Sequence, residues 1–313
     1  MDTHGPIVCA TDLSPGGARA VDLAASAARD LSAPLRLVHA ADTGAISSAS
    51  WKSTAQRTLE ERVRRRAAEL SGRLAAERQR AAATGVTVEH ALIEGRPHVA
   101  VIDDATRQQA RMIVVGPHGE TGPAEIMRSA ALEWLLGITA DRVLRGAPCP
   151  VLVASNRGDM PPLANGRWLV ALDFEPASRE ALALALRLAA RVGATVTAAH
   201  VLGAVPLASL ADATAPTADD WDPDAEETLA RTHLEQVVAE ARAAIPGAPA
   251  VVPRVVRGSP AGAITQLGAD LGATLLVVGT HGRTGLAHGL LGSVAERVLR
   301  RATVPVLVAR AQS

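Results

Sequence analysis

Glycines, a hydroxyl and a carboxylate stand at predicted strand ends in the second half of the sequence. Gly279 and Gly282 close an apolar run, and Gly292 and Ser293 follow after nine intervening residues, at the start of a helical pattern. Glycine lets backbone N–H groups approach an anion, and the unpaired N–H groups of a helix start favour a phosphate. Asp173 ends an earlier apolar run and is placed to accept from ribose hydroxyls. Together these residues predict a nucleotide site without a lysine.

The first half of the sequence carries an altered copy of this pattern. Asp12, Gly116 and Gly119 match the aspartate and the first two glycines, but 17 residues rather than nine lie between Gly119 and Gly137, the third glycine of the pattern. Ile138, which has no hydroxyl, then stands in place of the serine, and Glu120 would put a negative charge beside a phosphate. We therefore expect the first site to be impaired or to take a different ligand.

Two other residues could supply the missing hydroxyl of the first copy. Thr139 lies one position late. A different placement of the gap aligns Ser129 with Ser293, but Arg128 then stands where the pattern has glycine.

The overall composition argues against several classes of protein. Lys52 is the only lysine among 32 basic residues, and no P-loop glycines precede it, so P-loop NTPase, protein kinase and Schiff-base chemistry are poor candidates. The basic residues balance 32 acidic ones, and aromatic residues make up 2% of the chain. This balance argues against nucleic acid or an anionic membrane as a partner. No apolar run reaches the roughly 18 residues of a membrane span.

The cysteines and the N-terminal residues predict a compartment. Cys9 and Cys149 are too few for a disulfide framework or a four-ligand zinc site. The first residues show neither the charged nor the long apolar region of a signal peptide. We therefore expect a cytoplasmic protein without a protein-bound metal site.

The sequence repeats itself in two halves. Six blocks recur in the same order, at an offset of 161 residues for the first strands, 163 for the glycine pairs and 155 for the last strands. Apolar runs at 7–10, 35–40, 86–93, 112–116 and 150–154 match runs at 168–172, 194–201, 250–257, 274–279 and 305–309. Runs of this kind predict strands buried on both faces of a parallel sheet.

The segments between these runs predict helices. Leu59, Val63, Ala67, Leu70 and Leu74 place apolar side chains on one face of such a helix. The predicted fold class is α/β, with two tandem doubly wound, Rossmann-like domains. We place the first domain at 1–156, a Pro/Gly-rich linker at 157–166 and the second domain at 167–313.

The pattern Gly-x2-Gly-x9-Gly-Ser, the aspartate after the first strand and the final Pro-Val-Leu-Val resemble the universal stress protein family in its tandem form. The resemblance implies a five-stranded sheet of order 3-2-1-4-5 in each domain. For one branch of the family it implies bound ATP, and it implies that domains pair through their last strands. We also expect that the chain could form a homodimer.

Carried over to this sequence, the resemblance implies roles for individual residues. Asp173 would hold the nucleoside, and the backbone at Ala171 and Val201 would line the adenine. Gly279 and Gly282 would contact the ribose and phosphates. The phosphates would be held by Gly292, Ser293 and Val294. In the first domain, Asp12, Gly116 and Gly119 fit the same pattern.

Plainer interpretations stand beside these roles. Ser293 and Glu296 match a capping box, so the serine could simply cap a helix. Asp173 could serve only to form a turn. His39 and His200, at the ends of the second strands, are expected to pack rather than to catalyse.

The combined prediction is an ATP-binding stress-response or regulatory protein whose second domain holds the nucleotide, with Mg²⁺ accompanying the triphosphate. No catalytic base stands out, so we expect no enzyme activity beyond a weak ATPase. One alternative is a dimerisation or scaffold module without a ligand. Another is an adenine-nucleotide hydrolase or transferase, but its Ser-Gly-Gly-x-Asp-Ser and His-Ile-Gly-His motifs are missing.

Overall fold

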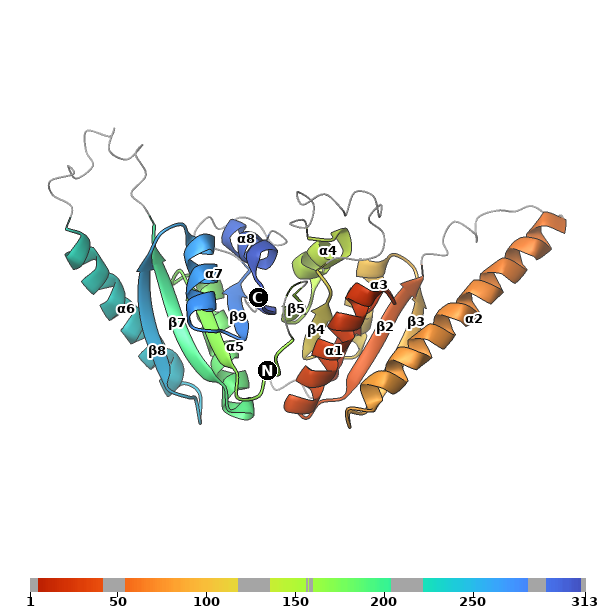
Figure 1. The fold of residues 1–313 in the computed structure, drawn as a ribbon, viewed down its shortest axis with the longest axis horizontal. Coiled ribbons are helices and arrows are strands. Elements are labelled where there is room, and N and C mark those ends of the chain that lie inside the picture. The colour runs from red at the N-terminus through yellow and green to blue at the C-terminus, as the bar shows by residue number, and fades with distance from the viewer. Residues whose placement is uncertain are drawn as a thin grey trace, which may run out of the picture. The chain divides into compact units, whose positions relative to one another are not determined.

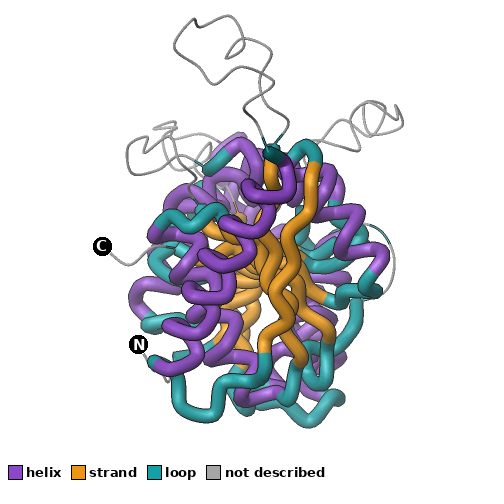
Figure 2. The backbone as a smooth tube through the Cα atoms, turned by 90° about the vertical axis from the view of Figure 1, so that its left-hand side faces the viewer, coloured by secondary structure: helices purple, strands orange, loops and turns teal. Residues whose placement is uncertain are grey.

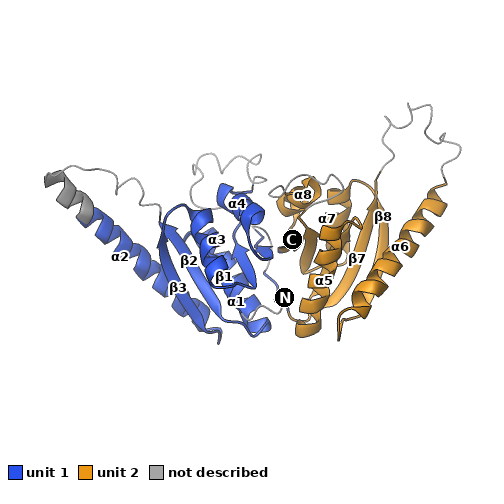
Figure 3. Ribbon diagram, turned by 180° about the vertical axis from the view of Figure 1, so that it is seen from behind, with its two compact units in different colours: residues 1–163, 303–305 blue, residues 164–302, 306–313 orange. Residues whose placement is uncertain are grey.

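The computed structural model describes residues 5–41, 54–117, 136–155, 157, 160–203, 222–280 and 291–310. The chain divides into two compact units (Figure 3). The first consists of residues 1–163 with 303–305, and the second of residues 164–302 with 306–313. Strand β6 begins at Arg167, where we predicted the second domain to begin.

The first unit alternates strands and helices in the order that the sequence predicts (Figure 1). Its strands are β1 (Ile7–Ala10), β2 (Leu35–Ala41), β3 (Val88–Glu94), β4 (Met112–Val115) and β5 (Val151–Val153). Its helices are α1 (Pro15–Asp30), α2 (Thr54–Ala82), α3 (Pro97–Arg107) and α4 (Ile138–Gly146). The strands are parallel and lie in the order β3-β2-β1-β4-β5, which confirms the predicted 3-2-1-4-5 topology.

The second unit repeats this arrangement. Its strands are β6 (Arg167–Leu172), β7 (Thr195–Leu202), β8 (Val251–Arg257), β9 (Leu275–Gly279) and β10 (Val306–Ala309). Its helices are α5 (Pro176–Val192), α6 (Pro223–Ala243), α7 (Pro260–Asp270) and α8 (Ser293–Arg301). The parallel strands lie in the equivalent order β8-β7-β6-β9-β10.

Helices cover both faces of each sheet. In the first unit α1 packs beside α2 and α3 beside α4; in the second, α5 packs beside α6 and α7 beside α8. Figure 2 shows the helices on either side of the strands. This three-layer arrangement follows from right-handed crossovers between parallel strands. In the described part of the chain, no helix has both the length and the apolar character needed to cross a bilayer.

The prediction that all strands are buried on both faces is correct for β1, β4, β5, β9 and β10 and wrong for β3 and β8. β1, β4 and β9 are buried along nearly their whole length. β8 consists of exposed and partly buried residues, and so does β3 apart from the buried Val88. Charged residues such as Glu89 and Arg254 occupy their exposed positions, as is usual for edge strands.

Helix α2 follows its predicted apolar stripe only in its C-terminal half. Leu70 and Leu74 are buried there, whereas Val63 and Ala67 are only partly covered. Leu59 lies among residues whose side chains the structure does not describe. The sheet thus covers only the last turns of this long helix.

A buried ion pair distinguishes the first unit from the second. Asp104 on α3, 1% exposed, accepts from Nε of Arg36 on β2 at 2.8 Å and from Nη2 at 3.1 Å. This bidentate contact raises the pKa of Arg36. Thr197 and Leu267 occupy the equivalent positions of the second unit. The same fold therefore holds the same helix to the same strand in two chemically different ways.

We expect Asp104→Leu alone to lower the free energy of unfolding of the first unit by about 3 kcal/mol, because it removes the buried partner of the largely buried Arg36 guanidinium and leaves only its ion pair with the exposed Glu89. The double variant Arg36→Thr/Asp104→Leu, which imports the residues of the second unit, should recover most of the loss. Urea unfolding followed by circular dichroism measures both. A double variant no more stable than the single one would contradict this account.

Candidate functional site

The carboxyl ends of the central strands meet at one edge of the sheet in the second unit. The register of β6 with β7 puts Asp173, directly after β6, level with Val201. The register of β6 with β9 puts Gly279 level with Leu172. In an open parallel sheet, ligands bind at this edge, where the strand order reverses. The fold therefore brings Asp173, Val201 and Gly279 to the switch point, with Ala171 inside β6 beside them.

Asp173 begins a tight turn that leads into α5. Its Oδ1 accepts from the backbone N–H of Glu175 at 3.1 Å, and its own N–H donates to Ser178 Oγ at 3.3 Å. Glu175 is the N-cap residue of α5, as expected from its place before Pro176. The turn-forming role of Asp173 is thus real. It uses one lone pair of the carboxylate, which leaves acceptor capacity for a ligand.

Phe174, the next residue, holds a left-handed backbone conformation with φ of 70°. A non-glycine residue pays about 1–2 kcal/mol for this conformation. The ring of Phe174 stacks between His200 of β7 and His233 of α6, with centroid distances of 4.2 Å on both sides (interplanar angles 26° and 25°). These contacts hold the residue in the strained conformation that the turn requires.

The histidines at the ends of the second strands have matching structural roles. His200 Nδ1 donates to the carbonyl of Leu172 at 2.8 Å, and His39 Nδ1 donates to the carbonyl of Thr11 at the same distance. In each case the acceptor directly precedes the site aspartate. The expectation that these residues pack rather than catalyse agrees with these contacts.

Gly279 is required by a close approach of two backbones. A Cβ atom at this position would lie 2.7 Å from the carbonyl carbon and oxygen of Ala177 and 2.9 Å from the nitrogen of Ser178, in the first turn of α5. Any side chain would push β9 and α5 apart. The glycine therefore lets the end of β9 lie against the turn that carries Asp173, whatever ligand binds there.

Helix α8 begins as an uncapped helix at the same edge. Gly292 is the N-cap residue, with no side chain to bond the helix, and Ser293 and Val294 are the first two helical residues. The capping-box interpretation of Ser293 is therefore wrong, because the serine lies one position inside the helix. The first N–H groups of a helix lack intrahelical acceptors, and among the described residues no side chain caps the start of α8. This leaves them able to bind an anion.

The base of the glycine loop is closed identically in both units. The N–H of Gly292 donates to the carbonyl of Thr280, and that of Gly137 donates to Pro117, each at 2.7 Å. Gly137 is likewise the N-cap residue of α4. Ile138 thus takes the place of Ser293, and its side chain is 73% exposed. This equivalence favours the alignment of Gly137 with Gly292 over the one that uses Ser129.

The site of the first unit differs around its aspartate as well. Asp12 Oδ1 accepts from the N–H and the Oγ of Ser14, at 3.1 and 2.6 Å. A Cβ atom on Gly17 would collide with this carboxylate. The second unit has Glu175 and Ser178 in place of Ser14 and Gly17, so the hydroxyl has moved from the N-cap to the third residue of the helix.

A polar pair lies beneath Asp12 where the second unit is apolar. Thr11, buried, donates its hydroxyl to Glu77 of α2 at 2.9 Å. Burial raises the pKa of Glu77, although the bond from Thr11 opposes this. The pKa of the Cys9 thiol is raised too, mainly by burial and to a smaller extent by the negative charge of nearby Glu77. Because the thiolate is the reactive form, this buried cysteine is unreactive. Leu172 stands in place of Thr11 in the second unit.

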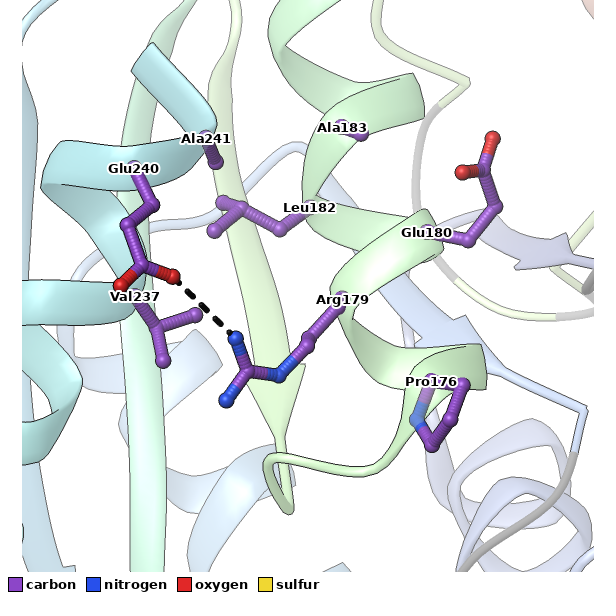
Figure 4. A pocket seen from close by; sticks show the side chains of 8 residues that line it. All are labelled: Pro176, Arg179, Glu180, Leu182, Ala183, Val237, Glu240 and Ala241. Atoms are coloured by element: carbon purple, nitrogen blue, oxygen red, sulfur yellow. Dashed lines mark hydrogen bonds and ion pairs between the residues drawn. The ribbon is translucent and has the colours of Figure 1, made fainter. Parts of the chain in front are cut away.

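A groove of about 440 Å³ lies between α5 and α6, outside the glycine loop (Figure 4). Leu182, Ala183, Val237 and Ala241 form its apolar part, and Arg179 and Glu240 face each other across it. None of the residues that line this groove is a predicted site residue, but Pro176 and Arg179 of its lining lie next to the turn that carries Asp173. Sequence patterns gave no sign of it, because its walls come from two separate helices.

Two predicted site residues, Gly119 and Gly282, lie outside the described residues, as do Glu120 and Ser129. Gly116, which the structure describes, directly follows β4 at the position equivalent to Gly279. Among the described residues, no group of three or more His, Cys, Asp or Glu side chains could hold a metal ion.

The chain resembles proteins of known family in sequence. The model of the universal stress protein family matches twice, at residues 4–155 and 165–310. A universal stress protein of Mycobacterium tuberculosis is 35% identical over 203 residues, which is 64% of this chain; the match spans 62% of the length of that relative. One of Mycolicibacterium smegmatis is 32% identical over 231 residues, 72% of this chain and 70% of the relative.

Solved structures share the fold of the whole chain. A universal stress protein of Archaeoglobus fulgidus covers 100% of both chains with a TM-score of 0.65 at 20% identity. One described as putative, from Pseudomonas aeruginosa, covers 99% of this chain and 95% of its own with a TM-score of 0.58 at 19% identity. With one family match in each half, the chain belongs to the universal stress protein family in its tandem form.

Proposed function

We propose that this chain is an ATP-binding regulatory protein of the stress response, and that its second domain holds the nucleotide. The observation that carries the proposal is the uncapped start of α8 at the switch point of the second unit. Gly292, Ser293 and Val294 present backbone N–H groups and a hydroxyl there. Asp173 and Gly279 border the same edge of the sheet.

The described residues fit a nucleoside triphosphate. The start of α8 would take the phosphates, because its N–H groups and its dipole favour negative charge. The carboxylate of Asp173 would accept from the ribose hydroxyls, and the backbone of Ala171 and Val201 would line the adenine. Gly282 would add a phosphate contact. Mg²⁺ would arrive with the triphosphate rather than through a protein cluster.

The first domain supports this division of roles. Asp12, Gly116 and Gly119 match the pattern, but Ile138 offers neither a hydroxyl nor a polar surface at the start of α4. We propose that the first domain binds ATP weakly or not at all. The same exposed isoleucine favours the second candidate function, a scaffold or dimerisation role for the first domain. Formation of a homodimer and a cytoplasmic location also stay predictions.

We propose binding without efficient turnover. Among the described residues of the second site, both histidine contacts serve the turn: His200 bonds the carbonyl of Leu172, and His233 stacks on Phe174. Neither is presented as a general base for an attacking water. A weak ATPase activity would then come from water that reaches bound ATP without help.

The nucleotide content of the purified chain tests the proposal directly. We expect about one ATP per chain after denaturation and anion-exchange separation, because one of the two helix starts carries Ser293. Two nucleotides per chain would show that Ile138 does not impair the first site. No nucleotide, together with no thermal shift on adding Mg-ATP, would favour the scaffold function instead.

Single substitutions in the second domain test whether this domain holds the nucleotide. We expect Asp173→Asn to weaken ATP binding roughly 10–100-fold, because hydrogen bonds to a charged acceptor are the stronger ones, while the amide oxygen can still accept from Glu175. Ser293→Ala should weaken it by a smaller factor. Isothermal titration calorimetry measures both.

The matched control is Asp12→Asn in the first unit, which should leave the ATP affinity unchanged. An equal loss in the Asp12 variant would mean that the first domain binds the nucleotide too. Unchanged affinity in both Asp173→Asn and Ser293→Ala would remove the second domain as the site.

A further inference from the structure

Arg179 ties the turn after Asp173 to a helix that lies elsewhere in the sequence. Its Nε donates to the carbonyl of Phe174 at 2.9 Å. Its Nη1 lies 3.4 Å from Glu240 of α6, and Nη2 lies 3.5 Å from Nε2 of His233, also on α6. Figure 4 shows the contact with Glu240 spanning the groove between α5 and α6.

Phe174 is held to the same helix by its ring. His233 stacks on one face of the ring, and His200 on the other. Both the carbonyl and the side chain of this left-handed residue therefore depend on contacts that lead to α6. The Glu175 N–H that bonds the Asp173 carboxylate lies directly after Phe174, so a change in the backbone angles of Phe174 moves the donor that orients this carboxylate.

The first unit reaches the same result with different residues. Leu13, the equivalent of Phe174, also has a positive φ, of 62°. Its carbonyl accepts from Nη2 of Arg73 at 2.6 Å, and Arg73 is on α2, the helix equivalent to α6. Ala18 stands at the position of Arg179. The arginine lies on α2 in the first unit and on α5 in the second, but in both units its guanidinium donates to the carbonyl of the residue that follows the aspartate.

The buried leucines of α2 and α6 show which residues of these two helices correspond. Arg73 directly precedes the buried Leu74 of α2, and His233 directly precedes the buried Leu234 of α6. His233 thus stands where the first unit has its arginine, and Arg179 supplies the guanidinium from the neighbouring α5. Two different solutions for one contact indicate that the contact itself matters, since packing alone does not require a guanidinium at this carbonyl.

We propose that Arg179 is a positioning residue for the nucleotide site of the second domain: it locks the Phe174 turn so that Asp173 meets the ribose, and it makes this alignment depend on α6. The inference rests on the proposed function. Arg179 itself contacts no nucleotide in this account. Without the guanidinium, the Phe174 carbonyl loses its donor and the turn gains access to other backbone angles. Asp173 then reaches its binding orientation only part of the time, which lowers the apparent affinity.

The test compares Arg179→Met with Arg187→Met by isothermal titration with Mg-ATP. Arg187 is a matched control, because it is also on α5 and also forms an ion pair, with Glu180 at 2.7 Å, but does not reach the turn. We expect Arg179→Met to raise the ATP Kd roughly tenfold, a factor typical of residues that act through another group. Arg187→Met should leave it unchanged. Arg179→Lys, which keeps a donor, should recover part of the affinity.

Amide hydrogen exchange separates positioning from general destabilisation. We expect Arg179→Met to speed exchange in peptides covering residues 173–178, where the Glu175 N–H bonds Asp173, while the urea midpoint stays equal to that of Arg187→Met. An unchanged Kd and unchanged exchange would overturn the proposal. So would an equal loss of affinity in both variants, or no recovery with lysine.

The two proposals fail in different ways. If the unmodified chain binds no ATP, the proposed function is overturned, and with it the role of Arg179 toward a nucleotide. Exchange at residues 173–178 would then still show whether Arg179 holds the turn. If the unmodified chain binds ATP and Arg179→Met binds it equally well, only the inference about Arg179 is overturned.

Discussion

The candidate sites of both repeats depend on one strained residue. Leu13 and Phe174 each hold a left-handed backbone directly after the site aspartate. In each repeat, a histidine from the neighbouring strand donates to the carbonyl of the residue before the aspartate. An arginine donates to the carbonyl of the strained residue that follows the aspartate. The turn would relax without these anchors, since bulky residues avoid this conformation. The direction of the aspartate is therefore set by contacts from outside its own segment.

A second constraint is the close contact between strand end and helix start. Gly279 leaves the room that α5 fills, so the turn of Asp173 and the end of β9 lie against each other. From there the chain leads to Gly292, whose bond to Thr280 fixes where α8 begins. These two backbone contacts thus bring the aspartate and the uncapped helix start to one edge of the sheet.

The two repeats preserve this frame while changing its chemistry. Glu175 and Ser178 stand in the second unit where the first has Ser14 and Gly17, so each unit keeps one hydroxyl at the start of the helix after the aspartate. The buried Arg36–Asp104 pair has become Thr197 and Leu267. At the helix start itself, Ile138 and Thr139 of the first unit stand where the second unit has Ser293 and Val294. The two repeats thus share one scaffold, and the two sites differ both at the helix start and around the aspartate.

The sequence by itself determined the duplication and the alternation of strands and helices, because both depend on apolar runs and on glycines whose spacing is visible along the chain. The strand order was implied only by the resemblance to the family, and the ligand-binding roles of the site residues stay predictions. The sequence could not reveal Arg179, the stacking of Phe174 between two histidines, or the groove between α5 and α6. These arise between residues such as Phe174 and His233 that lie far apart in sequence and meet only when α6 packs beside α5. Nor could it place Ser293 inside the helix rather than at its cap, because that choice depends on the bond between Gly292 and Thr280, which forms only in the folded unit.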